Sequence, residues 1–121
     1  MANKILILFV IIFISCSDNN NDLGSSKEET TNALYKYDLP ADGCDWHFSI
    51  YDKSETLLLV EDAASKPKTE MLKTEAKKVA GLPNVTVLLT YKLTGKTQKV
   101  QCGWNKTQDM QEISIKKVQI K

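Results

Sequence analysis

The sequence predicts a small α+β fold that is mainly β, with five to six short antiparallel strands and one helix. Apolar and polar residues alternate with a period of two through much of residues 34–121, which is typical of half-buried strands. Residues 65–81 have helical spacing instead. Turn-forming Pro, Gly, Asp and Asn residues separate these segments.

The first three predicted strands come before the helix. One begins at Leu34 and runs into a Pro-Ala-Asp-Gly turn at 40–43. A second covers 44–51, where Cys44, Trp46, Phe48 and Ile50 alternate with Asp45, His47, Ser49 and Tyr51. Residues 52–55 predict a hairpin turn, and the apolar run 56–61 forms the third strand.

The predicted helix covers residues 65–81. Ser65 is a suitable N-cap, and Pro67 suits the first turn, where its missing N–H is tolerated. Gly81 is a suitable terminator. One face of this helix carries Met71, Leu72, Glu75, Ala76, Val79 and Ala80.

The remaining strands follow the helix. Residues 85–93 alternate again, 93–96 predict a tight hairpin turn around Gly95, and 97–104 return as a strand. The last strand, 112–121, breaks its spacing between Ile115 and Val118, which predicts a bulge. A helix between the third and fourth strands is the ordering of an OB-like barrel, and a small sandwich is the alternative.

The N-terminus has the pattern of an export signal. Lys4 precedes an unbroken apolar run at 5–14, which is too short for a membrane span of about 20 residues but suits a signal peptide. The next residues, Phe13-Ile14-Ser15-Cys16, resemble the lipobox of bacterial lipoproteins. The resemblance implies that residues 1–15 are cleaved and that Cys16 becomes the lipid-bearing first residue. The alternative is an ordinary secretory signal with an incidental cysteine.

Residues 16–33 are predicted to form a lipidated, flexible tether. Positions 17–32 contain one apolar side chain, Leu23, and no aromatic, so they bury too little surface to offset the entropy of ordering them. The acidic, Asn-rich start of the tether resembles the segments that follow the lipid-bearing cysteine in surface-exported lipoproteins of Bacteroidota. The domain, with Asp-Gly-Cys at 42–44, Thr-Tyr-Lys-Leu-Thr-Gly at 90–95, Cys-Gly-Trp at 102–104 and its terminal strand, resembles small lipoproteins of Bacteroidota without an established function. We therefore expect a domain at 34–121 that is held at the outer membrane, facing the periplasm or the cell surface.

Assigning Cys16 to lipid leaves Cys44 and Cys102 as a pair. An exported chain lies in an oxidising compartment, so a disulfide is expected. Closing a loop of about 58 residues contributes roughly 4 kcal/mol on the chain-entropy model. The chain has no Cys-x-x-Cys motif, and two cysteines with His47 are too few ligands for a zinc site.

The charge balance argues against a nucleic-acid partner. The chain has 16 basic and 15 acidic residues, and removing Lys4 with the signal leaves 15 of each. A neutral chain lacks the excess positive charge that drives binding to polyanions.

Two tryptophans are the most notable candidate site residues. Trp46 and Trp104 each follow a cysteine by two residues, and residues i and i+2 of a strand share a face. The favoured interpretation is that both indoles pack around the disulfide, and the alternative is an exposed ligand or partner surface that includes His47. Asp45, His47 and Ser49 do not predict a triad, because i and i+2 side chains are about 6.5–7 Å apart and parallel.

No catalytic set, metal site or cofactor motif is predicted. Gly95-Lys96-Thr97 is not a P-loop, because the required upstream glycine is absent and the segment joins two strands. We expect a monomeric, non-catalytic binding or accessory module that engages an unknown protein or small ligand. The alternative is an inhibitor of an envelope enzyme, or a small envelope enzyme, using loops 38–43 and 103–111.

Overall fold

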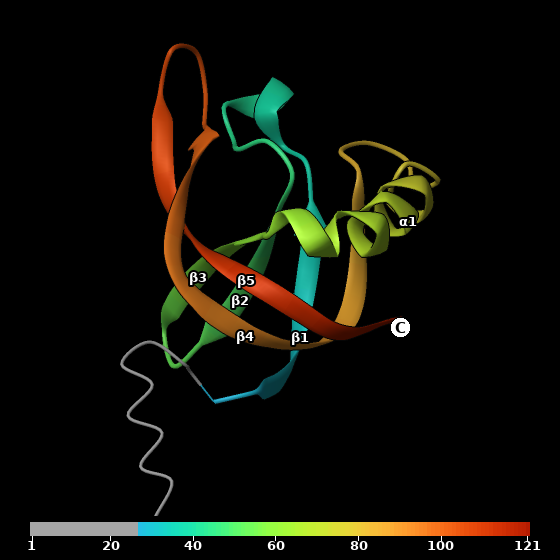
Figure 1. The fold of residues 1–121 in the computed structure, drawn as a ribbon. Helices are drawn as coiled ribbons and strands as arrows, with labels where there is room; N and C mark the ends of the chain where they lie inside the picture. The colour runs from blue at the N-terminus through green and yellow to red at the C-terminus, as the bar shows by residue number, and fades with distance from the viewer. Residues whose placement is uncertain (1–26) are drawn as a thin grey trace, which may run out of the picture.

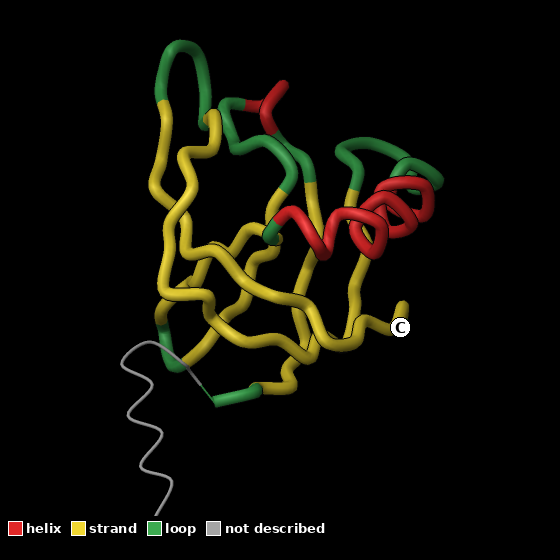
Figure 2. The backbone as a smooth tube through the Cα atoms, in the orientation of Figure 1, coloured by secondary structure: helices red, strands yellow, loops and turns green. Residues whose placement is uncertain are grey.

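The described chain, residues 27–121 of a computed structural model, folds into a closed five-stranded barrel (Figures 1 and 2). The predicted signal, Cys16 and most of the tether lie outside these residues. The strands are β1 (Glu29–Lys36), β2 (His47–Asp52), β3 (Glu55–Glu61), β4 (Asn84–Gln101) and β5 (Thr107–Ile120). The helical segments are η1 (Leu39–Ala41), η2 (Ala63–Ser65) and α1 (Lys66–Ala76).

The strand order around the barrel is β1-β2-β3-β5-β4, with α1 between β3 and β4. This is the OB-like arrangement, and it decides between the barrel and the sandwich. The prediction that the strands are antiparallel holds for every pair except β3 and β5, which run parallel from Leu59↔Gln111 to Glu61↔Ile113. The helix and β4 form the long connection that a parallel pair requires.

No hairpin forms at 93–96, so that prediction is wrong. The two strands predicted within 85–104 are a single strand, β4, and the barrel therefore has five strands. Residues 94–96 instead form a bulge in the continuous β4, between the pairs Leu93↔Ile113 and Thr97↔Gln111. Gly95 has a φ of 84°, a conformation that serves a bulge as well as a turn. The chain reverses at 102–106, and β5 therefore begins earlier than the predicted residue 112.

A second bulge lies where the sequence predicted it, between Ile115 and Val118. Tyr91 pairs with Ile115, whereas the preceding Thr90 pairs with Lys117, so Lys116 is the extra residue. Bulges increase the bend of a strand. The two bulges let β4 and β5 coil around the barrel as the longest strands (Figure 1).

The tether boundary predicted at residue 33 is too late. β1 begins at Glu29 and pairs with β4 from Glu29↔Tyr91 onward. Its early positions are Thr and Asn, which do not give an alternating apolar pattern, and Ala33 is its first buried residue. The polar composition of the segment concealed the start of the strand.

Helix α1 ends at Ala76, five residues before the predicted terminator Gly81. Its buried positions are Thr69, Leu72 and Ala76, and the next apolar residue, Val79, is exposed. The helix ends where its buried stripe ends, because packing supplies most of the stability of a short helix. Pro67 lies in the first turn as expected, but the Ser65 hydroxyl accepts from the Ile115 backbone N–H (2.9 Å) and does not cap α1.

The core lies inside the barrel, and α1 covers part of it. Its largest fully buried side chains include Tyr35, Phe48, Leu59, Leu72 and Leu89. A smaller cluster, formed by Cys44, Val60, Val100 and Met110, lies near the end where β1 leads into β2. Within residues 27–121, no helix has the length and apolar character to cross a membrane.

Candidate functional site: the stapled loops and the Trp46 groove

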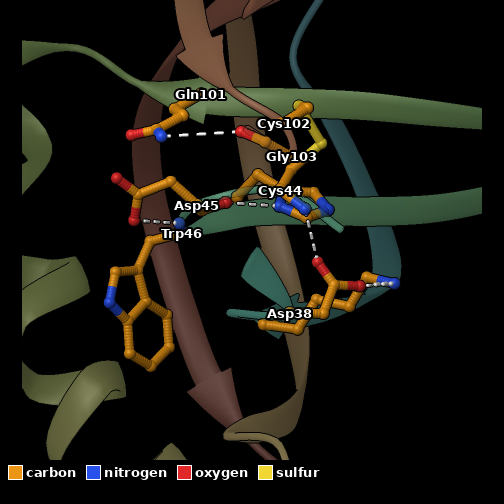
Figure 3. Close-up of a disulfide and its surroundings, with 9 residues drawn as sticks. Asp38, Cys44, Asp45, Trp46, Gln101, Cys102 and Gly103 are labelled. Carbon is orange, nitrogen blue, oxygen red and sulfur yellow. Dashed lines mark hydrogen bonds and ion pairs between the residues drawn. A yellow bond between two sulfur atoms is a disulfide. The ribbon is translucent and has the colours of Figure 1, made fainter. Parts of the chain in front are cut away.

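A disulfide between Cys44 and Cys102 joins the β1–β2 loop, residues 37–46, to the β4–β5 loop, residues 102–106 (Figure 3). We call these two segments the stapled loops. The predicted pairing is confirmed, with an S–S distance of 2.01 Å. Backbone hydrogen bonds from Asp45 N–H to the Gln101 carbonyl (2.8 Å) and from Gly103 N–H to the Gly43 carbonyl (2.9 Å) add to the cross-link. The two loops therefore form one unit at one end of the barrel.

Asp38 organises the first of these loops. Its carboxylate accepts from the Cys44 backbone N–H (2.7 Å) and pairs with the Lys36 ammonium (3.0 Å). Its carbonyl accepts from the N–H groups of Ala41 (3.0 Å) and Gly43 (2.9 Å). Partial burial alone would raise the pKa of Asp38, but the hydrogen bonds from Lys36 and Cys44 outweigh it and lower the pKa.

Gly43 is required by this arrangement. A Cβ at position 43 would lie 2.7 Å from the Asp38 carbonyl oxygen and would also meet the Asp38 carboxylate. Only glycine lets the backbone approach Asp38 this closely. The close approach of the loop to Asp38 therefore explains the glycine of the Asp-Gly-Cys sequence at 42–44.

Trp104 projects into solvent from the second stapled loop, with 83% of its surface exposed. The interpretation that it packs around the disulfide is wrong, because β4 ends at Gln101 and the period-two rule does not extend past the strand. Gly103 and Asn105 on either side have positive φ, which turns the chain sharply at the tryptophan. An open depression of about 360 Å³ separates Trp104 from Leu39 on the other loop.

Trp46 is half-buried and lies away from the disulfide, toward α1 (Figure 3). Its indole stacks on Tyr35 (centroids 5.1 Å apart) and on Tyr37 (5.4 Å). The Lys73 ammonium of α1 lies 5.8 Å from the indole centroid, within cation–π range. Trp46 therefore joins the barrel core to the helix, and the expected packing on Cys44 does not occur.

His47 is buried, with 2% of its surface exposed, so the alternative in which it belongs to an exposed ligand or partner surface is wrong. Its Nδ1 lies 2.7 Å from the Asp45 carbonyl oxygen. Burial lowers the pKa of His47, against the opposing effects of that carbonyl and of the Asp38 charge. The first stapled loop lies over this end of β2. The alternation of polar and apolar residues within the strand could not predict that contact.

Glu61, at the end of β3, is a buried carboxylate that the sequence did not single out. Only 7% of its surface is exposed. Its Oε1 accepts from the Thr69 hydroxyl of α1 (3.1 Å), whereas its Oε2 has no hydrogen-bond partner among the described residues. Burial is the largest effect on the Glu61 carboxyl and raises its pKa. The sequence feature that could have indicated this buried carboxylate is a glutamate at the end of the apolar run 56–61.

Glu61 and Trp46 line a groove of about 230 Å³ between α1, the start of β2 and the end of β4, which we call the Trp46 groove. Lys66 and Lys73 contribute from α1. The other lining residues are Asp45, Val60, Gln98, Lys99, Val100 and Gln101. The Gln98 amide donates to the Glu61 carbonyl (3.0 Å) and to the Glu112 carboxylate (2.8 Å), which fixes the groove wall.

Residues 27–121 contain no group of three or more His, Cys, Asp or Glu side chains arranged to hold a metal ion. Comparison with protein-family models, with curated proteins and with solved structures finds no significant match to this chain. The functional inference therefore depends on the stapled loops and the Trp46 groove themselves.

Proposed function

We propose that this chain is an envelope-anchored lipoprotein whose barrel is a non-catalytic binding module, with the stapled loops as its partner-binding surface. The observation that carries the proposal is the exposure of Trp104 on a loop that a disulfide and backbone hydrogen bonds hold in place. A large apolar side chain in water at such a position has no role in the core, and tryptophan is enriched among the residues that dominate binding energy.

The rigidity of the stapled loops supports binding. Association loses the entropy of every loop that it must order, so a surface already fixed by covalent and hydrogen bonds binds at lower entropic cost. Asp38, Gly43 and the disulfide fix the backbone on both sides of the depression beside Trp104.

The position of the stapled loops supports a role away from the membrane. β1 begins at Glu29 at one end of the barrel, and the loops lie at the opposite end (Figure 1). A tether leading to a lipidated Cys16 would leave from the Glu29 end, so the stapled loops would face away from the lipid. The inhibitor alternative uses the same surface, since an exposed apolar tip on a fixed loop suits insertion into an enzyme cleft.

A photo-crosslinking amino acid at position 104 tests the proposal in membranes of the native host. We expect one discrete protein adduct that excess unmodified protein suppresses. Position 51 provides the matched control, because Tyr51 is also an exposed aromatic (76%) but lies by the β2–β3 turn at the other end of the barrel. Equal adducts at both positions, or none at position 104 in folded protein, would contradict the proposal.

A further inference from the structure

We infer that helix α1 is a movable lid on the barrel, and that a buried polar cluster beneath it makes the lid open more readily as the pH rises. The polar cluster consists of Tyr35 of β1, Glu61 at the end of β3 and Thr69 of α1. At most 7% of the surface of each residue is exposed. None of the three belongs to the stapled loops, so the inference does not depend on the proposed function.

The helix is held on the barrel by little apolar surface. Of its 11 residues, Thr69, Leu72 and Ala76 are buried, so Leu72 is the one large apolar side chain that α1 inserts into the core. Met71 of the same helix is half exposed (50%). An isolated helix shorter than about 12–15 residues is marginal in water, so α1 would unfold when it leaves the barrel. Elements with few buried apolar contacts open locally, ahead of the whole domain.

The interface between α1 and the barrel leaves polar atoms unpaired. The Glu61 Oε1 atom accepts from the Thr69 hydroxyl (3.1 Å). Glu61 Oε2 and the Tyr35 hydroxyl are buried without a hydrogen-bond partner in residues 27–121. Most buried polar side chains are paired, and an unpaired one loses the hydrogen bonds that it makes with water. Opening of α1 would return both atoms to water, which offsets part of the cost of removing Leu72 from the core.

Glu61 makes this opening depend on pH. Burial is the largest effect on its carboxyl and raises its pKa above 4.5. In the open state the carboxyl meets water, so its pKa returns toward 4.5. Opening therefore releases a proton at any pH between these two values. A rise in pH through that window favours the open state, and above the pKa of the closed state the effect is complete.

The charged groups around Glu61 reduce this effect without reversing it. Lys66 and Lys73 of α1 lower the pKa of Glu61, but burial outweighs them. From β4, the Gln98 amide donates to the Glu61 carbonyl (3.0 Å) and to the Glu112 carboxylate of β5 (2.8 Å). Burial, which opening removes, therefore sets the direction of the pH dependence.

Tyr35 does not titrate in the same window. Burial and the negative charges of Glu61, Glu70 and Asp45 hold its pKa well above the usual value of 10, and the facing Thr69 hydroxyl acts in the opposite direction to a smaller extent. Tyr35 is a neutral phenol whether or not Glu61 is ionised. The pH dependence therefore belongs to the Glu61 carboxyl.

Native-state hydrogen exchange of the full chain tests both parts of the inference. Exchange is measured from about pH 4.5 to 8 for the amides at 70–76 of α1 and at 87–91 of β4, which pairs with strands on both sides there, and is corrected for the intrinsic effect of pH. We expect the α1 amides to be less protected than those of β4 at every pH. The ratio of the two opening constants should rise with pH, by about tenfold for each unit by which burial raises the pKa of Glu61. Taking the ratio removes changes in global stability.

Matched glutamine variants identify the group responsible. Glu61→Gln keeps the shape of the side chain and removes its charge, so the ratio should become independent of pH. Glu75→Gln removes a carboxylate of the same helix that pairs with Lys78 at the surface, and it should keep the wild-type pH dependence. Equal protection of α1 and β4, or a wild-type ratio that is constant with pH, would overturn the inference. A pH dependence that survives in Glu61→Gln would also overturn it. None of these results bears on crosslinking at position 104.

Discussion

At the scale of single residues, His47 and Glu61 are buried, and Asp38 is half-buried. The pKa values of all three are shifted by burial and by local hydrogen bonds. Asp38 has several hydrogen-bond partners, whereas Glu61 Oε2 has none in the described chain. Asp38 therefore stabilises a loop through its carboxylate, whereas Glu61 is buried under α1 with one carboxylate oxygen unpaired in the described chain.

His47 makes the stability of the domain depend on pH. Its pKa in the folded state is below the unfolded value of 6.5. Above pH 6.5 both states hold a neutral imidazole. As the pH falls below 6.5, the unfolded state takes up a proton that the folded state resists, and the free energy of unfolding decreases until the folded pKa is reached. Urea denaturation between pH 7.5 and 5 should show this decrease.

The His47→Gln variant isolates this effect from the other charges around it. Asp38 and Asp45 raise the pKa of His47 and Lys36 lowers it, and all three remain in the variant. Glu61 acts in the opposite direction, because its raised pKa makes the folded state gain stability as the pH falls toward 4.5. The difference in unfolding free energy between wild type and variant should therefore change with pH below 6.5, and a constant difference would contradict the prediction.

At the scale of elements, the stapled loops are two short segments that neither strand pairing nor core packing holds alone. The disulfide closes a sequence separation of 58 residues, which contributes about 4 kcal/mol on the chain-entropy model. The double variant Cys44→Ser, Cys102→Ser should therefore lower the free energy of unfolding by about that amount in urea denaturation. Wild type under reducing conditions should show the same loss, and a variant as stable as the oxidised wild type would contradict the prediction.

The sequence predicted those elements whose signal is local and missed those decided by tertiary contacts. The bulge after Ile115 was visible as a broken alternation, and the disulfide followed from a count of cysteines. The continuity of β4 through Gly95 was not visible, because a positive φ suits a hairpin and a bulge alike. The early end of α1 depends on where its buried stripe stops against the barrel.

The residues of the candidate site also differ in whether the local sequence could predict their surroundings. Trp46 and Trp104 occupy the same position relative to a cysteine, yet one stacks in the core and the other lies in solvent. The difference arises because the chain after Gln101 leaves the sheet at once, whereas residue 46 leads directly into β2. Glu61 was missed because the proximity of β3, α1 and Trp46 is a property of the closed barrel.

At the scale of the whole molecule, the point where the chain enters the barrel and the stapled loops lie at opposite ends. The chain enters β1 at Glu29, and the stapled loops lie at the other end (Figure 1). The proposed anchor, if attached at the Glu29 end, would leave the stapled loops facing the aqueous side. This polarity is the reason the proposed lipid at Cys16 and the proposed binding surfaces are compatible in one small chain.

The proposed lipid anchor can be tested separately from the fold because Cys16 precedes the barrel, whereas Cys44 and Cys102 lie within it. We predict that Cys16→Ser gives protein that is no longer acylated, either released in soluble form or retained unprocessed with its signal. The double variant Cys44→Ser, Cys102→Ser should remain acylated and membrane-bound despite its lower stability. Metabolic labelling with a fatty acid and membrane fractionation measure both outcomes. Since one acyl chain holds a protein only marginally and two or three hold it stably, alkaline washing should not extract the wild type. Label on the Cys16→Ser variant, or its absence from wild type, would exclude the lipoprotein assignment while leaving the barrel and its groove intact.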